Sequence, residues 1–251
     1  MTLLVATALS VLLWFIPFAE VLTYPFRIFV TFIHEGGHAL AALLMGHSVQ
    51  SLSVHSDASG LTITTGQRGL FSEMFIASAG YIGAMAFGAL LLVLIRRATA
   101  ARIVLLSSAA FIFALTMIFG LIKPLFWFDT WSGIPFTLVA GTFIPLALVL
   151  IARFASARVA TFFVSFLAVQ SVLNALFDLK TVLFLSSPFV QPVSTDAANM
   201  AQATGIPALL WATLWIVLGM GLLWFVMRLY VAGRDQTFQA DLPFEDTPPV
   251  G

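Results

Sequence analysis

The sequence has no cysteine and few charged residues. Only 9% of its 251 residues are Asp, Glu, Lys or Arg, and 61% are hydrophobic. A soluble domain carries about a quarter charged residues, so the composition indicates an integral membrane protein. Without cysteine no disulfide can form, and any metal ligands must be histidine or carboxylate.

An excess of charge of either sign is also missing. The formal net charge is zero, and lysine and arginine occur singly or in small groups between apolar runs. A nucleic-acid interface needs a basic patch or stripe, so we expect no nucleic-acid partner. No soluble or nucleotide-sensing domain is expected either, because the apolar runs leave too little chain between them. The N-terminal stretch lacks the basic start and the cleavage site of a signal peptide, which predicts a retained helix.

Seven apolar segments are long enough to be membrane helices. We therefore predict an all-α polytopic membrane protein with about seven transmembrane helices, in a single domain over residues 1–233. The polar residues 234–251 are predicted to form a disordered tail. The predicted segments cover residues 3–22, 27–46, 71–95, 103–122, 134–152, 159–179 and 206–229.

One stretch, Ser48 to Gly69, has a different pattern. Apolar residues alternate there with Ser, Thr and Gln, and residues 56–60 interrupt the alternation, which predicts one small β-hairpin. Non-helical backbone is tolerated at membrane depth only where it is buried or lines a wet cavity. Two interpretations stay open. The hairpin offers an open edge to an extended peptide, or it is a plain surface hairpin.

The distribution of basic residues predicts an orientation. If all seven segments span, most arginines fall on one side, which places the C-terminus in the cytoplasm and the N-terminus outside. The residues on that side are Arg27, Arg96, Arg97, Arg102, Arg153, Arg158, Arg228 and Arg234, against Arg68, Lys123 and Lys180 on the other.

The most informative motif lies in the second segment and reads His34-Glu35-Gly36-Gly37-His38. On a helix His34 and His38 leave the same face one turn apart and can bind one metal ion, with Glu35 beside them. A zinc hydrolase needs this spacing, because the metal polarises a carbonyl while the carboxylate takes up a proton. The alternative is a polar cluster that hydrogen-bonds neighbouring helices. Burying an ionisable trio in hydrocarbon is costly, however, and usually marks a functional site.

A third protein ligand is expected from a polar stripe in the sixth segment. Gln170, Asn174 and Asp178 recur every four residues on an otherwise apolar helix, so they share a face that points to the protein interior. Asp178 is the preferred ligand, and its alternative role is that of a helix-end acid paired with Lys180. Asn174 is expected either to contact the substrate or to pack between helices.

Asp196 is the alternative third ligand. It could also hydrogen-bond a ligating histidine from behind the metal. The simplest interpretation is different, because either Thr195 or Asp196 can cap a short helix that begins here.

Taken together, these residues resemble the site-2 protease group of intramembrane zinc metallopeptidases, in particular its small bacterial-type members without accessory domains. The resemblance extends from about Tyr24 to Asn199 and includes the motif, the hairpin, the small residues of 78–83 and Asp178. It implies a zinc ion bound by His34, His38 and Asp178.

The resemblance also implies that Glu35 is the general base. The activity it implies is cleavage of a peptide bond in a membrane-protein substrate, within or near the lipid bilayer of a bacterial plasma membrane. The sequence departs from the family pattern after the late aspartate, because Leu179 follows Asp178 where larger members have glycine.

Two other functions are considered. One is a non-catalytic metal-binding membrane scaffold or regulator, but a pure binding site has no use for a base at Glu35. The other is a metal-ion transporter, which would need polar residues across several helices.

Overall fold

The long apolar runs fold as helices, because a helix satisfies its own backbone hydrogen bonds where lipid offers none. The computed structural model describes residues 2–13, 15–16, 18–66, 69–95, 100–127, 131–187, 189 and 193–240. The helices are α1 (Thr2–Leu13), α2 (Glu20–Leu44), α3 (Leu70–Leu94), α4 (Ala100–Leu115), α5 (Ile134–Phe154), α6 (Ala157–Leu185), α7 (Asp196–Thr204) and α8 (Ala208–Ala240). A π-helical turn η1 (Thr116–Ile122) and a 3-10 turn η2 (Lys123–Phe126) continue α4.

Five of the described helices are long and apolar enough to cross a membrane. They are Leu70–Leu94, Ala101–Phe126, Ile134–Phe154, Ala157–Leu185 and Ala208–Arg228. The prediction of seven spans is not confirmed. The difference lies in the first two segments, where α1 has only 12 residues and the motif-bearing α2 has 25.

The start of α2 also differs from the prediction. The predicted second segment starts at residue 27, but α2 begins at Glu20 and includes Pro25. A proline this close to the start removes one helical hydrogen bond and leaves the later turns intact.

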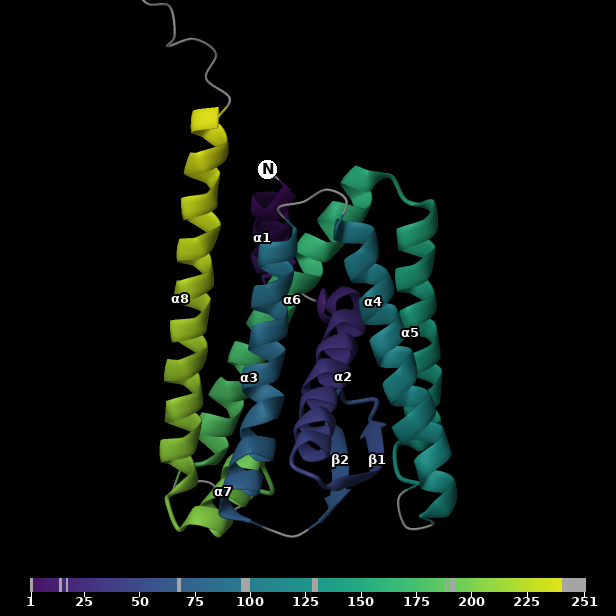
Figure 1. Cartoon of the computed structure of the whole chain (residues 1–251), viewed down its shortest axis with the longest axis vertical. Helices are drawn as coiled ribbons and strands as arrows, with labels where there is room; N and C mark the ends of the chain where they lie inside the picture. Colours follow the sequence, from purple (N-terminus) through teal and green to yellow (C-terminus); the bar gives the residue numbers. More distant parts are fainter. Residues whose placement is uncertain are drawn as a thin grey trace, which may run out of the picture.

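The predicted placement of the termini on opposite sides is not what the fold shows. In Figure 1 α1 lies near the upper end of the bundle and α2 near its lower end, so together they make one passage. The start of α1 and the end of α8 consequently lie at the same end of the bundle. The described part of α8 reaches Ala240, and residues 241–251 lie outside the description, so the boundary at 233 stays a prediction.

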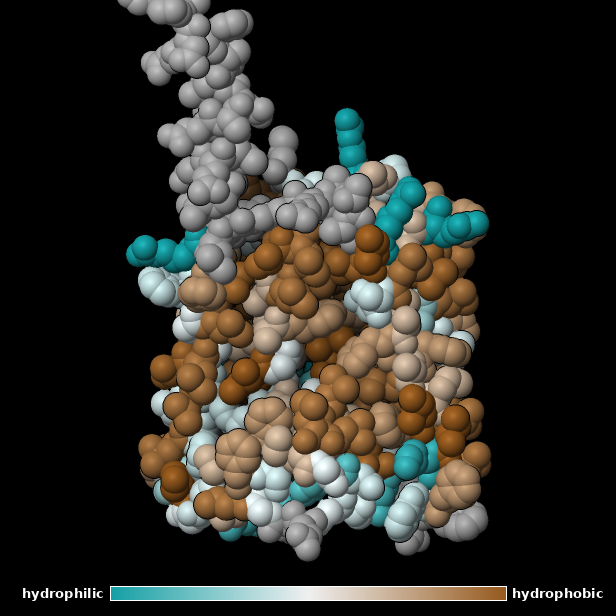
Figure 2. Space-filling view, in the orientation of Figure 1, coloured by the Kyte–Doolittle hydropathy of each residue, from teal (hydrophilic) through white to brown (hydrophobic). Residues whose placement is uncertain are grey.

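The molecular surface fits this arrangement. Figure 2 shows an apolar band across the middle of the visible face, with hydrophilic residues at the upper and lower ends. Large apolar side chains on the outer faces of the helices are exposed, for example Phe143, Phe154 and Val217. Such exposure suits lipid-facing positions.

The predicted hairpin is present and follows α2 directly. Strand β1 (Ser48–Val54) pairs antiparallel with β2 (Gly60–Thr65), with an irregularity between Val49 and Ser51. In the turn, Asp57 Oδ1 accepts hydrogen bonds from the Ser59 amide at 2.9 Å and its hydroxyl at 2.7 Å. These two bonds lower the pKa of the exposed Asp57 carboxyl.

The two outer edges of the hairpin have different surroundings. At the β1 edge, Thr137 Oγ1 of α5 accepts from the Val54 amide at 2.7 Å and lies 3.1 Å from the Val54 carbonyl oxygen. The β2 edge lies on the side of α2 and α7 (Figure 1). The fold thus covers one strand edge and leaves the other beside the helix that carries the histidines.

Candidate metal centre

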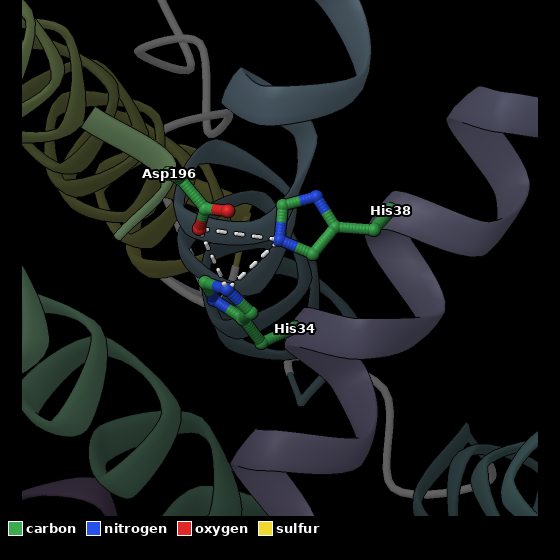
Figure 3. A group of neighbouring side chains, drawn as sticks. All are labelled: His34, His38 and Asp196. Carbon is green, nitrogen blue, oxygen red and sulfur yellow. Dashed lines mark hydrogen bonds and ion pairs between the residues drawn. The ribbon is translucent and has the colours of Figure 1, made fainter. Parts of the chain in front are cut away.

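The two histidines of the motif converge on one acidic side chain. His34 and His38 leave the same face of α2, and their Nε2 atoms are 3.0 Å apart. Asp196 Oδ2, from the start of α7, lies 3.4 Å from His34 Nε2 and 3.3 Å from His38 Nε2. Figure 3 shows the three side chains pointing toward one another from the two helices.

The Asp196 carboxylate can approach the histidines because the neighbouring Thr195 caps α7 in its place. Thr195 Oγ1 accepts a hydrogen bond from the Ala198 amide at 3.1 Å, which fulfils the capping role we had considered for either residue. Burial raises the pKa of Asp196, but the nearby His38 and His34 lower it more strongly, so the net pKa lies below its ordinary value. The carboxylate is therefore ionised, as a metal ligand must be.

The His38 ring is oriented as metal binding requires. Its Nδ1 is 2.7 Å from the carbonyl oxygen of Ile76 in α3. A carbonyl only accepts, so Nδ1 carries the proton, and in the neutral ring Nε2 keeps its lone pair toward His34 and Asp196. Such a hydrogen bond on the far ring nitrogen is the usual support of a metal-binding histidine.

The donor set fits a zinc-sized ion. Around zinc with bonds of about 2.0–2.1 Å, tetrahedral ligand atoms lie about 3.3 Å from one another. The three separations here are 3.0, 3.3 and 3.4 Å. In the part of the chain that the structure describes, His34, His38 and Asp196 are the group of acidic and histidine side chains able to hold a metal ion.

Gly80 of α3 keeps the space beside the imidazoles open. A Cβ atom at this position would collide with the Nε2 atoms of both His34 and His38. Gly37 plays a related part on α2, because a Cβ there would collide with the carbonyl oxygen of Ala79. The two glycines let α2 and α3 cross closely at the site, as small residues do between membrane helices.

Glu35 is held by the hairpin. Thr62 Oγ1 of β2 lies 2.7 Å from the Glu35 carboxylate and 3.2 Å from the Glu35 carbonyl oxygen. Gly60 lies so close that a Cβ there would collide with the Glu35 side chain. Glu35 is 5% exposed and is not part of the metal-ligating group. The arrangement leaves it available as a base beside the metal.

The site opens into a cavity of about 840 Å³. Its walls come from α2, β2, the first turns of α3, the end of α6 and the region from Ser194 to Ala203. His34, Glu35, His38 and Asp196 all line it. A substrate in this space would therefore reach the ligand group and the base together.

Comparison with known proteins agrees with this geometry. The family model of the Peptidase M50B-like proteins matches residues 2–226. The chain belongs to the Peptidase M50B-like family. This is the site-2 protease family, a family of membrane metallopeptidases, as the resemblance of the sequence had implied. A search of the curated proteins and a search of the solved structures gave no match.

Within this M50B-like fold, Asp178 takes a different position from the one we expected. It lies on the exposed side of α6 at the cavity wall and interacts electrostatically with His34 and Arg27. It is not in the group whose ligand atoms lie within 4.8 Å of one another, and Asp196 is. The geometry favours the alternative ligand over the preferred one, because the start of α7 brings Asp196 against the histidine face of α2.

Gln170 and Asn174 of the polar stripe on α6 face the protein interior, but they do not reach the histidines of α2. The Asn174 amide donates to the Gln170 carbonyl oxygen at 2.8 Å and its side-chain oxygen at 3.2 Å. Gln170 in turn donates to Ser10 Oγ of α1 at 3.4 Å. Asn174 is absent from the cavity wall, so its bonds to Gln170 within α6 explain it better than substrate contact.

Sequence reasoning missed several residues of this M50B-like site. Thr62, Gly60 and Gly80 became visible only once the hairpin and α3 were placed against α2. The two motif glycines make room for neighbouring helices. Gly37 admits α3, while a Cβ at Gly36 would press on Phe111 and Leu115 of the α4 helix.

Proposed function

We propose that this protein is a zinc metallopeptidase that hydrolyses peptide bonds of membrane-protein substrates within or near the bilayer. The observation that carries the proposal is the convergence of His34, His38 and Asp196 beside Glu35, in one cavity of a membrane-metallopeptidase fold. The support is specific, because these polar side chains come from separate elements and packing alone does not require them to meet.

Zinc is the proposed metal. Two imidazoles and one carboxylate form the donor set of many catalytic zinc sites, and the three separations fit its tetrahedral preference. His34, His38 and Asp196 would hold the ion, with Asp196 in place of the Asp178 that we first preferred. When bound, the metal supplies Lewis acidity, which activates water and a peptide carbonyl.

Glu35 is the proposed general base. It accepts a proton from the attacking water and later returns it to the leaving amine. Thr62 holds one side of the carboxylate through the 2.7 Å hydrogen bond, and Gly60 leaves it room. This restraint fixes the base relative to the cavity before a substrate arrives.

The proposed partner is an extended segment of a membrane protein. The amide and carbonyl groups of Val54 point away from β2, toward Thr137. In an antiparallel pair, the backbone groups of its partner Gly60 then point away from β1, and those of Thr62, two residues on, do the same. This outer edge of β2 is available to an added strand, whereas the β1 edge is occupied by Thr137. A substrate helix would first unwind locally to present its backbone.

The test uses purified protein in detergent with zinc and a panel of single-span peptides whose apolar segments contain central Gly or Pro. We expect cleavage by the wild type, detected by mass spectrometry, and none by Glu35→Gln with zinc content unchanged. Equal cleavage by Glu35→Gln would refute the mechanism. No cleavage by the wild type despite stoichiometric zinc would favour a non-catalytic metal-binding scaffold or regulator.

We further propose a multi-pass location in a bacterial plasma membrane, with the lipid bilayer as the surroundings of the apolar band. The described arginines Arg102, Arg153 and Arg158 lie at the end where α4 and α6 begin, which the positive-inside rule assigns to the cytoplasm. The natural absence of cysteine allows a direct check. An impermeant maleimide added to intact cells should label Ser59→Cys in the hairpin turn and spare Ser156→Cys. The opposite pattern would invert the orientation.

A further inference from the structure

Tyr81 of α3 presents a hydroxyl group that nothing in the fold uses. The residue is 7% exposed and lines the same cavity as the histidines and Glu35. Among the described residues, no group is hydrogen-bonded to this hydroxyl. It is not sealed in the core either, since the enclosed and unpaired side-chain oxygens found there are those of Ser171 and Ser186. The hydroxyl therefore borders the cavity, where a bound ligand can accept its hydrogen bond.

The ring of Tyr81 is held from two sides. It lies edge-on to the His34 imidazole, with ring centroids 4.5 Å apart and planes at 75°. Trp215 of α8 lies behind it at 5.3 Å, and the Trp215 indole donates a hydrogen bond to Ser78 Oγ at 3.0 Å. The hydroxyl therefore has a fixed position relative to a metal ligand, which is what a catalytic donor requires.

The charged groups near the hydroxyl are all acceptors. Tyr81 interacts electrostatically with Asp196, Asp178 and Glu35, all of them carboxylates that accept when ionised and cannot donate. Asn174, a donor that we considered for substrate contact, is bonded to Gln170. Other neutral donors, such as Asn199 and Gln202, line the same cavity, but Tyr81 is the one whose ring is packed against the His34 imidazole.

Building on the proposed peptidase function, we propose that Tyr81 is a catalytic residue that hydrogen-bonds the oxygen of the scissile carbonyl. Negative charge develops on this oxygen as water adds to the carbonyl carbon, and a pre-positioned donor stabilises the charge more than it stabilises the uncharged substrate. The phenol keeps its proton throughout. The contribution is therefore expected in kcat and not in KM.

The first test is Tyr81→Phe, which removes the hydroxyl and keeps the ring against His34 and Trp215. With a peptide that the wild type cleaves, we expect kcat to fall by roughly a hundredfold, with KM and bound zinc unchanged. Tyr24→Phe is the matched control. It removes a hydroxyl that donates to the Ser56 carbonyl oxygen at 2.6 Å, away from the metal centre, and should retain kcat. A wild-type kcat in Tyr81→Phe would overturn the proposal.

A binding measurement tests the donor without relying on turnover. A phosphinic dipeptide carries a tetrahedral, negatively charged group in place of the peptide carbonyl. Calorimetry on the zinc-loaded protein should show its affinity weakened by about tenfold or more in Tyr81→Phe. A simple thiol, which needs only the metal, should bind both proteins alike. Equal phosphinate affinity in both, including equally undetectable binding, would overturn the assignment.

The two measurements also separate this inference from the proposed function. If the wild type cleaves no peptide but binds the phosphinate, and Tyr81→Phe binds it more weakly, the peptidase proposal fails while the donor role stands. If cleavage requires Glu35 but does not change when the Tyr81 hydroxyl is removed, the peptidase proposal stands and the donor role of Tyr81 fails.

Discussion

Two apolar helices of this protein carry polar side chains four residues apart, and they use them differently. On α2, His34 and His38 meet the carboxylate of Asp196, which arrives from α7. On α6, Asn174 donates to Gln170, and Gln170 donates to Ser10 of α1. One set forms a candidate metal centre, and the other joins two helices.

The comparison shows what helical periodicity can and cannot establish. In both helices the spacing identifies correctly the face that turns away from lipid, because polar groups in hydrocarbon need partners. Function depends on the partner. The histidines meet a charge from a distant part of the chain, whereas the amides are satisfied by their own neighbours and a hydroxyl.

The largest effect is expected when the two candidate ligands, Asp196 and Asp178, are removed one at a time. Asp196→Ala removes a ligand atom, and losing only a hydrogen-bonded support behind a ligand already costs 10–100-fold in affinity, so we expect zinc affinity to fall by more than about a hundredfold. Asp178→Ala should keep stoichiometric zinc. Metal analysis of the purified proteins decides. If Asp178→Ala lost the metal and Asp196→Ala kept it, the α6 stripe would be the ligand helix after all.

A second test fills the space beside the imidazoles. Gly80→Ala places a methyl group against both Nε2 atoms, so bound zinc should be lost while the helices stay folded. Gly83→Ala is the matched control on the same helix, since its Cβ would meet only Gly37 Cα at 3.8 Å. Zinc content and thermal unfolding are measured for both. Full zinc binding in Gly80→Ala would show that the metal lies elsewhere.

A smaller effect is expected from the residue that holds the base. Thr62→Val removes the hydrogen bond to Glu35 and leaves the ligands untouched, so kcat should fall by roughly tenfold at constant zinc content. Thr65→Val changes the last residue of the same strand, outside the cavity wall, and should behave as the wild type. A loss of zinc in Thr62→Val would mean that the hairpin supports the ligands and not the base.

The smallest effect concerns the α6 stripe itself. Asn174→Leu removes the bonds to Gln170 within α6 and should lower the free energy of unfolding by about 0.5–1.5 kcal/mol, the net contribution of a hydrogen bond in a folded protein. Zinc content and kcat should not change. Denaturation in mixed micelles gives the free energy, and a large loss of kcat would instead return Asn174 to the active site.

The parts of the site that were predictable from the sequence depend on short-range geometry. His34 and His38 share a face because a helix returns to the same face after four residues, whatever it packs against. The hairpin was predictable for the same reason, since alternation and a turn specify it locally. The count of seven spans is not confirmed, because segment length alone did not show that α1 has only 12 residues and that α1 and α2 follow one another along the bundle (Figure 1).

The sequence by itself determined the membrane class, the motif helix, the hairpin and the inward face of α6, because each follows from composition or from a repeat of two or four residues. Only the tertiary structure decided that Asp196 and not Asp178 meets the histidines. It also decided that Thr62 holds Glu35 and that Tyr81 stands beside His34. These contacts join residues that are far apart in the chain, and no local pattern records how α3, α7 and the hairpin close around α2.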